Sequence, residues 1–210
     1  MSEALRAAIV RWGKSLFDRG LTAGSSGNIS VRTESGYLAT PTNSCLGFLD
    51  AGQLSELDGD GRHVAGSAPT KELPLHFAFY RNRPEARAVV HLHSTYATAL
   101  SCLADVDPAD AIPPITPYVV MRVGKVPVVP YTRPGSADVA PLIDAVAPDH
   151  AAVLLQNHGP VLSGASLESA VFAIEELEEA AKLALLTRGM PVRWLDAEQI
   201  ADLNRHFRLK

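Results

Sequence analysis

The stretch AVVHLHSTYATAL, residues 88–100, decides how the middle of the chain folds. Its apolar first half, residues 88–93, predicts a strand, and a helix is expected to begin near Ser94. In a strand, residues i and i+2 project from the same face, so His91 and His93 point to one side. Neutral imidazoles at this spacing suit a shared divalent metal ion. An isolated pair is more often two ordinary core or surface histidines, so a third ligand has to decide between the two interpretations.

A third histidine follows another apolar run. His158 comes soon after AAVLLQ, residues 151–156, which predicts a strand, and it lies between Asn157 and Gly159. Three histidines from two strand ends would form the open three-ligand site of a catalytic zinc, with a position left for substrate. Taken alone, His158 could equally be an ordinary turn residue. The remaining histidines lack this context and are interpreted as surface or structural groups: His63, His76, His150 and His206.

An acidic residue occurs at the start of a predicted helix. In PTKELPLH, Thr70 is the expected N-cap of a helix over residues 71–83, and Glu72 directly follows Lys71. An acid in the first helical turn commonly just complements the helix dipole. The alternative is a general acid or base held near the metal. Of the four histidines assigned as surface or structural groups, His76 has the weakest support for that assignment, because it lies one helical turn after Glu72.

Two short polar turns are candidates for binding a phosphate. Their sequences are SSGNIS, residues 25–30, and TPTN, residues 40–43. Backbone N–H groups of such turns, together with polar side chains, can hold an anion. Ordinary turn formation is the alternative for each, and the G-K-[S/T] of a Walker loop is absent. Lys71, beside Thr70, adds a positive charge that suits an anionic substrate. The alternative is an ordinary surface lysine whose charge is solvated. The candidate side chains in the turns are Ser26, Asn28, Thr42 and Asn43.

Composition excludes several classes of protein. The 210 residues carry a net charge of −4, which gives no basic surface for nucleic acid, and 47% of them are hydrophobic, as in an ordinary globular protein. No apolar run is long enough to span a membrane, and the first residues lack the pattern of a secretory signal. Cys45 and Cys102 have no paired spacing, so we expect a cytoplasmic protein without a disulfide framework. We expect one domain over residues 1–210.

The remaining pattern predicts an α/β fold. A long helix with Ser166 as N-cap is expected to stop at Gly189. Strands and helices are mixed without strict β-α-β alternation. We therefore predict a single-domain α/β/α sandwich around a mostly antiparallel or mixed sheet. The expected elements not yet given are helices over 3–18, 94–103 and 167–189, and strands over 29–33, 36–40 and 125–131.

The ordered set GNIS, TPTN, PTKELPLH, VVHLHS and QNHG resembles the class II aldolase/adducin family over residues 3–187. The resemblance implies the fold of that family, a homotetramer and a bound divalent metal, usually Zn²⁺. It implies that His91, His93 and His158 are the metal ligands, and that Glu72 is the catalytic acid or base. It also implies a phosphate site formed by Gly27, Asn28, Thr42, Asn43, Thr70 and Lys71.

One departure narrows the resemblance within the family. Sugar-phosphate aldolases carry S-S-E where this chain has Thr70, Lys71 and Glu72. Together with TPYVVMRVGKVPVVPY, residues 116–131, this segment resembles the subgroup of 3-oxo-tetronate 4-phosphate decarboxylases. A lysine suits such a substrate, because the substrate carries both a carboxylate and a phosphate.

The implied reaction is metal-dependent decarboxylation to dihydroxyacetone phosphate and CO₂. The metal would stabilise the enediolate left by loss of CO₂, and Glu72 would deliver a proton to C2. Lys71 is expected to anchor the carboxylate or the phosphate. One alternative is a class II aldolase acting on a fuculose- or ribulose-type phosphate. Another is a non-catalytic adducin-like interaction module, against which the three histidines and Glu72 argue. Further candidates for the site are Tyr118, Tyr131, Arg122 and Arg133.

Overall fold

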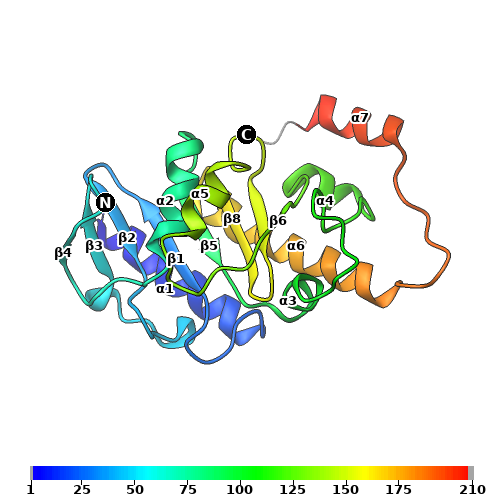
Figure 1. The fold of residues 1–210 in the computed structure, drawn as a ribbon. Helices are drawn as coiled ribbons and strands as arrows, with labels where there is room; N and C mark the ends of the chain where they lie inside the picture. The colour runs from blue at the N-terminus through cyan, green and yellow to red at the C-terminus, as the bar shows by residue number, and fades with distance from the viewer. Residues whose placement is uncertain (1, 208–210) are drawn as a thin grey trace.

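One sheet runs through the whole molecule (Figure 1). The computed structural model describes residues 2–207, and within them eight strands form a single sheet in the order β4-β3-β2-β1-β5-β8-β7-β6. Neighbouring strands are antiparallel, except that β6 and β7 are parallel. The mostly antiparallel, mixed sheet expected from the sequence is therefore confirmed. The strands are β1 (Asn28–Arg32), β2 (Gly36–Ala39), β3 (Ser55–Asp58), β4 (His63–Ala65), β5 (Ala88–His91), β6 (Val128–Val129), β7 (Ala152–Leu155) and β8 (Gly159–Gly164).

Seven α-helices and two short 3₁₀ helices accompany the sheet in the described part of the chain. The last helix, α7, follows an extended segment and lies at the edge of the molecule beside α4 (Figure 1). None of the described helices is long and apolar enough to cross a membrane. The helices are α1 (Ser2–Asp18), η1 (Leu46–Phe48), η2 (Ala51–Gln53), α2 (Leu73–Asn82), α3 (Thr95–Ser101), α4 (Pro117–Arg122), α5 (Val139–Asp144), α6 (Leu167–Leu186) and α7 (Ala197–His206).

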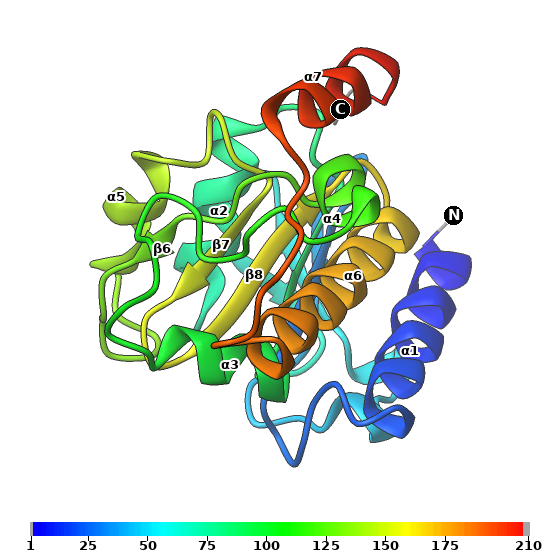
Figure 2. The ribbon, with the colours of Figure 1, turned by 90° about the vertical axis from the view of Figure 1, so that its right-hand side faces the viewer.

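Helices cover both faces of the sheet (Figure 2). Successive residues of a strand point to opposite sides, so each strand supplies side chains to two separate clusters. In β5, Val90 belongs to the cluster that includes α1 and α6, whereas Val89 belongs to the cluster that includes α2 and α5. Strand β7 divides in the same way, with Leu154 on the first face and Val153 on the second. The predicted α/β/α sandwich is confirmed.

The α2 face of the sheet also receives polar side chains at one end. His91 has the same parity as Val89 in β5, so it points toward α2. In the antiparallel register, Asn28 of β1 is paired with His91, and Ser30 is paired with Val89. Asn28, Ser30 and His91 are all buried. This end of the sheet therefore carries a polar group of residues within an otherwise apolar layer.

The strand predicted over residues 88–93 is shorter in the structure. Strand β5 ends at His91, which pairs with Val161 of β8, so His93 lies just beyond the ladder. Pro160 precedes Val161 and has no N–H with which to continue the pairing. His93 nevertheless stays beside His91, with ring centroids 4.9 Å apart.

The helix predicted from residue 71 begins later than expected. Helix α2 starts at Leu73, and Glu72 rather than Thr70 is its N-cap residue. Pro74 accounts for this start, because proline is tolerated in the first helical turn but not further inside a helix. Thr70 instead accepts a hydrogen bond from the Glu72 backbone N–H at 3.2 Å through its side chain. The hydroxyl of Thr70 thus supports the turn that aims Glu72.

The predicted long C-terminal helix is present. Ser166 caps α6 by accepting a hydrogen bond from the Ser169 backbone N–H, and Gly189 follows the helix with a φ of 78°. The sequence analysis did not predict β3, β4, β8, α4, α5 or α7. All but α7 have six residues or fewer, which is too short for hydrophobic periodicity to be recognised.

Candidate active site

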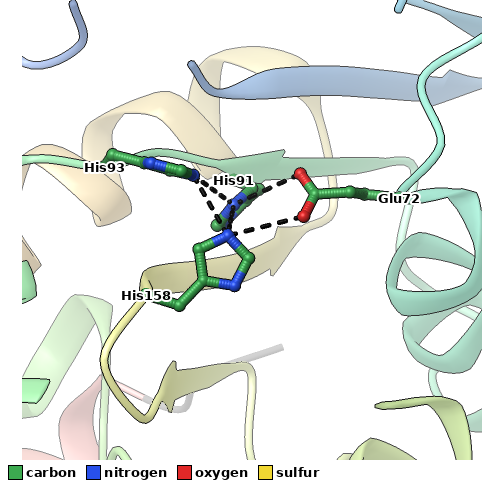
Figure 3. Close-up of side chains that lie close together, drawn as sticks. All are labelled: Glu72, His91, His93 and His158. Carbon is green, nitrogen blue, oxygen red and sulfur yellow. Dashed lines mark hydrogen bonds and ion pairs between the residues drawn. The ribbon is translucent and has the colours of Figure 1, made fainter. Parts of the chain in front are cut away.

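Three histidine side chains converge where β5 ends and the β7–β8 turn begins (Figure 3). The Nε2 atom of His91 lies 3.1 Å from Nε2 of His93 and 3.3 Å from Nε2 of His158. The Nε2 atoms of His93 and His158 are 3.1 Å apart. Residues from distant parts of the chain thus aim the same ring nitrogen at one point.

The spacing of these nitrogens fits a tetrahedral metal ion. A Zn–N bond of about 2.0–2.1 Å places two ligand nitrogens of a tetrahedron about 3.3–3.4 Å apart. Glu72 completes the donor set, since its carboxylate and the three histidines each offer an atom within 4.8 Å of the others. Imidazoles and a carboxylate are ligands typical of zinc and neighbouring divalent ions. The cluster can therefore hold a divalent metal.

The histidines offer lone pairs rather than protons. Nδ1 of fully buried His91 lies 2.9 Å from the carbonyl oxygen of Pro160, which can only accept, so Nδ1 carries the hydrogen and Nε2 is free to bind a metal. Burial, and then the neighbouring His158 and His93, hold the pKa of His91 well below its usual range. Burial also lowers the pKa of His93 and of His158. Metal binding near neutral pH therefore displaces few protons.

The backbone conformation of the β7–β8 turn explains why Asn157 and Gly159 flank His158. Strands β7 and β8 form a hairpin, and Asn157 in its turn has a φ of 55°, a region that asparagine tolerates better than most residues. Gly159 is required by close approach, because a Cβ there would lie 2.4 Å from the carbonyl oxygen of Leu92. This contact brings the turn that carries His158 against the segment that carries His93.

Glu72 faces the histidines from the start of α2 (Figure 3). Only 6% of this residue is exposed. Its Oε2 atom lies 3.5 Å from Nε2 of His91, and its Oε1 atom lies 3.4 Å from Nε2 of His158. Nδ2 of Asn28 donates a hydrogen bond to Oε2 at 2.8 Å. The carboxyl group is thus oriented beside the cluster, where a general acid or base for a metal-bound substrate has to lie.

His93 is held by a helix that begins two residues after it. The N-terminus of α3 is capped by Glu178 of α6, whose carboxylate oxygens accept hydrogen bonds from the backbone N–H groups of Tyr96 and Ala97, each at 2.8 Å. Ser94 occupies the N-cap position but makes no capping bond through its side chain. The sequence analysis missed Glu178, because no local pattern marks a glutamate inside one helix as the cap of another.

The polar turns and the segment before the glutamate lie side by side. The side chain of Thr40 accepts a hydrogen bond from the Ile29 backbone N–H at 3.1 Å. The Thr42 backbone N–H donates to the carbonyl of Ala68 at 2.9 Å, and the Thr70 N–H donates to the carbonyl of Thr40 at 3.1 Å. The structure therefore brings together the three segments that the sequence analysis selected for phosphate.

Two turn residues in these segments have left-handed backbone. Gly27 has a φ of 81°, and a Cβ there would lie 3.1 Å from the carbonyl oxygen of His91. Asn43 has a φ of 56°. Glycine and asparagine adopt this region at low cost, which explains their presence in G-N and T-N. Gly27 also places the first turn directly beside the end of β5 that carries His91.

Lys71 packs across a loop beside the cluster. A Cβ on Gly135, whose φ is 81°, would lie 3.1 Å from Cγ of Lys71, so the lysine stem covers this glycine. Arg133 is in the same loop. At the start of the loop, the backbone N–H of Tyr131 donates to Oε1 of Gln156 at 3.1 Å, next to the β7–β8 turn. Of the further candidates, Tyr131 and Arg133 are thus on the segment that contacts Lys71.

Tyr118 and Arg122 form a separate pair on α4. The guanidinium of Arg122 lies 5.7 Å from the ring centroid of Tyr118. Helix α4 packs against α6 and α7. Within the described contacts of one chain, neither residue joins the histidines or Glu72.

His76 is a buried polar residue that the sequence analysis assigned as a surface or structural group. It is fully buried on α2, with Nε2 2.5 Å from Oδ1 of Asn28 and Nδ1 2.7 Å from Oγ of Ser30. Burial, and then the neighbouring His91, lower its pKa to about 3. The one available signal was its spacing of four residues from Glu72, which places both on one side of α2.

The buried His76 predicts a loss of stability in acid. As the pH falls through 6.5, the unfolded chain binds a proton at this residue, whereas the folded protein, with a pKa of about 3, does not. Stability present above pH 6.5 is therefore lost as the pH falls, by up to about 1.4 kcal/mol per pH unit. In urea unfolding of metal-free protein, His76→Gln should reduce this slope between about pH 6 and 4. Equal slopes in the two proteins would contradict the prediction.

A large hollow lies elsewhere in the molecule. Its volume is about 1050 Å³, and it is lined by residues of α1, β1, β2 and β3 that include Arg32, Glu56 and Asp58. No histidine or cysteine lines it. Because the metal-binding donor set is at the histidines, the candidate active site is there and not in this hollow.

The chain is similar in sequence to a known family and to named enzymes within it. Residues 7–185 match the family described as class II aldolase and adducin N-terminal domain. The chain is 52% identical over 200 residues to a 3-oxo-tetronate 4-phosphate decarboxylase of Pectobacterium atrosepticum, with 95% of this chain and 92% of that protein covered. It is 35% identical over 193 residues to an L-fuculose phosphate aldolase of Escherichia coli, with 90% of this chain and 87% of that protein covered.

Solved structures share the fold. The crystal structure of YgbL from Escherichia coli has a TM-score of 0.94 at 49% identity, and the match covers 96% of this chain and 98% of that chain. A structure of an L-fuculose 1-phosphate aldolase has a TM-score of 0.87 at 28% identity, with 97% and 95% covered. The family match spans α1 to α6 and includes all four residues of the cluster. The chain therefore belongs to the class II aldolase and adducin family.

Proposed function

We propose that this protein is a metal-dependent 3-oxo-tetronate 4-phosphate decarboxylase that forms dihydroxyacetone phosphate and CO₂. The observation that carries the proposal is the cluster of His91, His93, His158 and Glu72. It occurs in a chain that is 52% identical to a decarboxylase of that name and 35% identical to an L-fuculose phosphate aldolase. The Thr70-Lys71-Glu72 segment supports the decarboxylase over the aldolase.

The proposed metal is Zn²⁺, held by Nε2 of His91, His93 and His158. The nitrogen spacing of 3.1–3.3 Å supports this assignment. When bound, the metal supplies a Lewis acid that stabilises negative charge developing on the substrate oxygens. The protein contributes neutral imidazoles and a buried setting in which such electrostatic stabilisation is strong.

Decarboxylation breaks the bond between C1 and C2 of the β-keto acid. CO₂ leaves with C1, and the electron pair of the broken bond stays on C2, in conjugation with the C3 carbonyl. Glu72 in its acid form then delivers one proton to C2, which gives dihydroxyacetone phosphate. Because Oε2 of Glu72 already accepts a hydrogen bond from Asn28, the proton is best carried on Oε1.

Substrate recognition is proposed to involve the polar turns and Lys71. Lys71 is exposed at the edge of the cluster. Burial is the main cause of the lowered pKa of His158; Glu72 opposes this shift, and the charge of Lys71 adds to it. A cation at this position suits a substrate with a carboxylate and a phosphate. The proposed phosphate-binding residues are Gly27, Asn28, Thr42, Asn43, Thr70 and Lys71.

We also propose that residues 1–210 act as one domain, within a cytoplasmic homotetramer. Unpaired Cys45 and Cys102 support a reducing compartment. Exposed apolar side chains support a subunit interface, since Phe48 is 82% exposed and Met190 is 62% exposed.

A product assay tests the function directly. Zinc-loaded protein is incubated with enzymatically generated 3-oxo-tetronate 4-phosphate, and CO₂ and triose phosphate are followed together. We expect equal amounts of both products. Release of an aldehyde from fuculose 1-phosphate, without CO₂ from the keto acid, would instead establish an aldolase. Absence of bound divalent metal after supplementation would favour the non-catalytic, adducin-like alternative.

A further inference from the structure

A chain of buried polar side chains extends from Glu72 into the layer between α2 and the sheet. Asn28 joins Glu72 to His76, since its Nδ2 is 2.8 Å from Oε2 of Glu72 and its Oδ1 is 2.5 Å from Nε2 of His76. Nδ1 of His76 is 2.7 Å from Oγ of Ser30, which is 2.9 Å from the hydroxyl oxygen of Tyr80. Each of these five residues is at most 6% exposed.

The direction of every hydrogen bond in this chain follows from its Glu72 end when Oε2 carries no proton. The carboxylate of Glu72 only accepts, so Asn28 has to present its NH₂ group there and turn its carbonyl oxygen toward His76. That oxygen also only accepts, so Nε2 of His76 has to carry the hydrogen. A neutral histidine with a hydrogen on Nε2 has an acceptor at Nδ1. Ser30 then donates to Nδ1, and Tyr80 donates to Ser30.

The buried environment keeps His76 neutral, as this pattern requires. Burial lowers the pKa of His76 to about 3, and burial raises the pKa of Tyr80, so the phenol keeps its proton. The chain therefore runs in one direction, from the Tyr80 hydroxyl to the Glu72 carboxylate, and each group between these two ends both donates and accepts. A fully satisfied buried network of this kind restricts the side chains that it joins.

The opposite orientation of the Asn28 amide would require a different set of protons. Its oxygen would face Oε2 of Glu72, and two acceptors could share that contact only if Oε2 were protonated. Nε2 of His76 would then face an NH₂ group and have to accept, which moves the ring hydrogen to Nδ1. The state of the His76 ring therefore reports which way Asn28 points and which oxygen of Glu72 accepts from it.

We propose that His76 is a positioning residue: its Nε2–H orients the amide of Asn28, which in turn holds Oε2 of Glu72 as an acceptor and leaves Oε1 to carry the transferred proton. The proposal rests on the acid/base role of Glu72 in the proposed function. Ser30 and Tyr80 are compatible with this orientation, because the Ser30 hydroxyl can donate to Nδ1 of His76 and accept from the Tyr80 hydroxyl.

The first test measures the ring hydrogen itself and does not depend on turnover. Zinc-loaded wild-type protein labelled with ¹⁵N-histidine is examined by long-range ¹H–¹⁵N correlation, and His76 is assigned from the spectrum of His76→Gln. We expect His76 to be neutral at neutral pH with its hydrogen on Nε2. A hydrogen on Nδ1 would overturn the proposal.

The second test separates positioning from a merely structural role. In His76→Gln the amide nitrogen can replace the Nε2–H donor, whereas His76→Leu removes it. We expect His76→Leu to lower kcat about 10–100-fold with KM and zinc content close to wild type, and His76→Gln to recover most of the loss. An unchanged kcat in His76→Leu, or a His76→Gln variant as slow as His76→Leu, would overturn the proposal.

The two tests distinguish failure of this proposal from failure of the proposed function. If the wild-type protein releases no CO₂ from the keto acid, the proposed function is wrong, and the ring hydrogen of His76 still decides the orientation of Asn28. If the wild type is active and the variants do not follow the expected order, only the positioning role fails. Should His76→Leu not fold, Ser30→Ala removes the donor to Nδ1 but leaves the Asn28 oxygen at Nε2, so the ring hydrogen is expected to stay on Nε2, and a shift to Nδ1 counts against the role of Asn28.

Discussion

Replacement of Glu72 by glutamine is expected to abolish turnover while leaving the metal in place. The substitution keeps the size of the side chain and an oxygen that can accept from Asn28, but it removes the acidic proton. Loss of a positioned acid or base typically lowers kcat about 10²–10⁴-fold. The histidine nitrogens, which lie 3.1–3.3 Å apart, are untouched, so zinc content should stay at the wild-type level. The measurements are kcat from coupled triose phosphate detection and metal content by mass spectrometry.

The matched control for this variant is Glu34→Gln. Glu34 is exposed in the turn between β1 and β2, so the same chemical change there should leave kcat unaltered. Full activity in Glu72→Gln would show that another group protonates C2. Loss of zinc in Glu72→Gln would show that the carboxylate is needed as a metal ligand, and the acid/base role would then need independent proof.

Replacement of His93 by alanine is expected to abolish metal retention. His93 contributes one of three converging Nε2 atoms, and its removal leaves only His91 and His158 as nitrogen ligands. Loss of a group that merely supports a metal ligand costs about 10–100-fold in affinity, so loss of a ligand should cost more than about 100-fold. The protein should therefore emerge from dialysis against a weak chelator without metal and without decarboxylase activity.

The control for His93→Ala is His206→Ala. His206 is exposed on α7, and among the described residues its polar contacts are local, from Nδ1 to the carbonyl oxygen and the carboxylate of Asp202. Its removal should change neither zinc content nor activity. Retention of a full equivalent of zinc by His93→Ala would contradict the three-histidine site, whatever its effect on turnover.

The relationship between the decarboxylase and the aldolases is understandable from this cluster. Cleavage of a carboxylate or of an aldehyde from the same carbon leaves the same kind of electron pair beside a carbonyl group. A divalent metal and a proton donor serve both reactions. The difference has to come from residues that hold the leaving group, and we propose Lys71, whose stem packs over Gly135, for that role.

Much of the fold could be predicted from local patterns. Helices α1 and α6 carry strong apolar periodicity, and Ser166 and Gly189 mark the start and stop of α6 as expected. Several short elements were not predicted, because a strand such as β4, with three exposed residues, has no alternation of apolar and polar residues to recognise. The start of α2 was misplaced, because Thr70 is a residue typical of an N-cap, whereas the helix begins at Leu73 with Pro74 in its first turn.

The residues that make up the site could be predicted from the sequence, but the hydrogen bonds that hold them in place could not. The sequence by itself determined the candidates: an H-x-H pair, a distant N-H-G and a K-E at a helix start, together with the family resemblance that these motifs carry, selected His91, His93, His158 and Glu72. The roles expected for them come from that resemblance and from what imidazole and carboxyl groups can do chemically.

Only the tertiary structure decided how those residues are held. The Nε2 spacing depends on Gly159 allowing the backbone near Leu92 to approach, and α3 depends on a cap from Glu178 of another helix. His76 resembled an ordinary helix residue until the pairing of β1 with β5 placed Asn28 between it and Glu72. The physical reason is that hydrogen-bond partners distant in sequence are chosen by sheet register and helix packing, whereas local sequence encodes only the capacity to donate or accept.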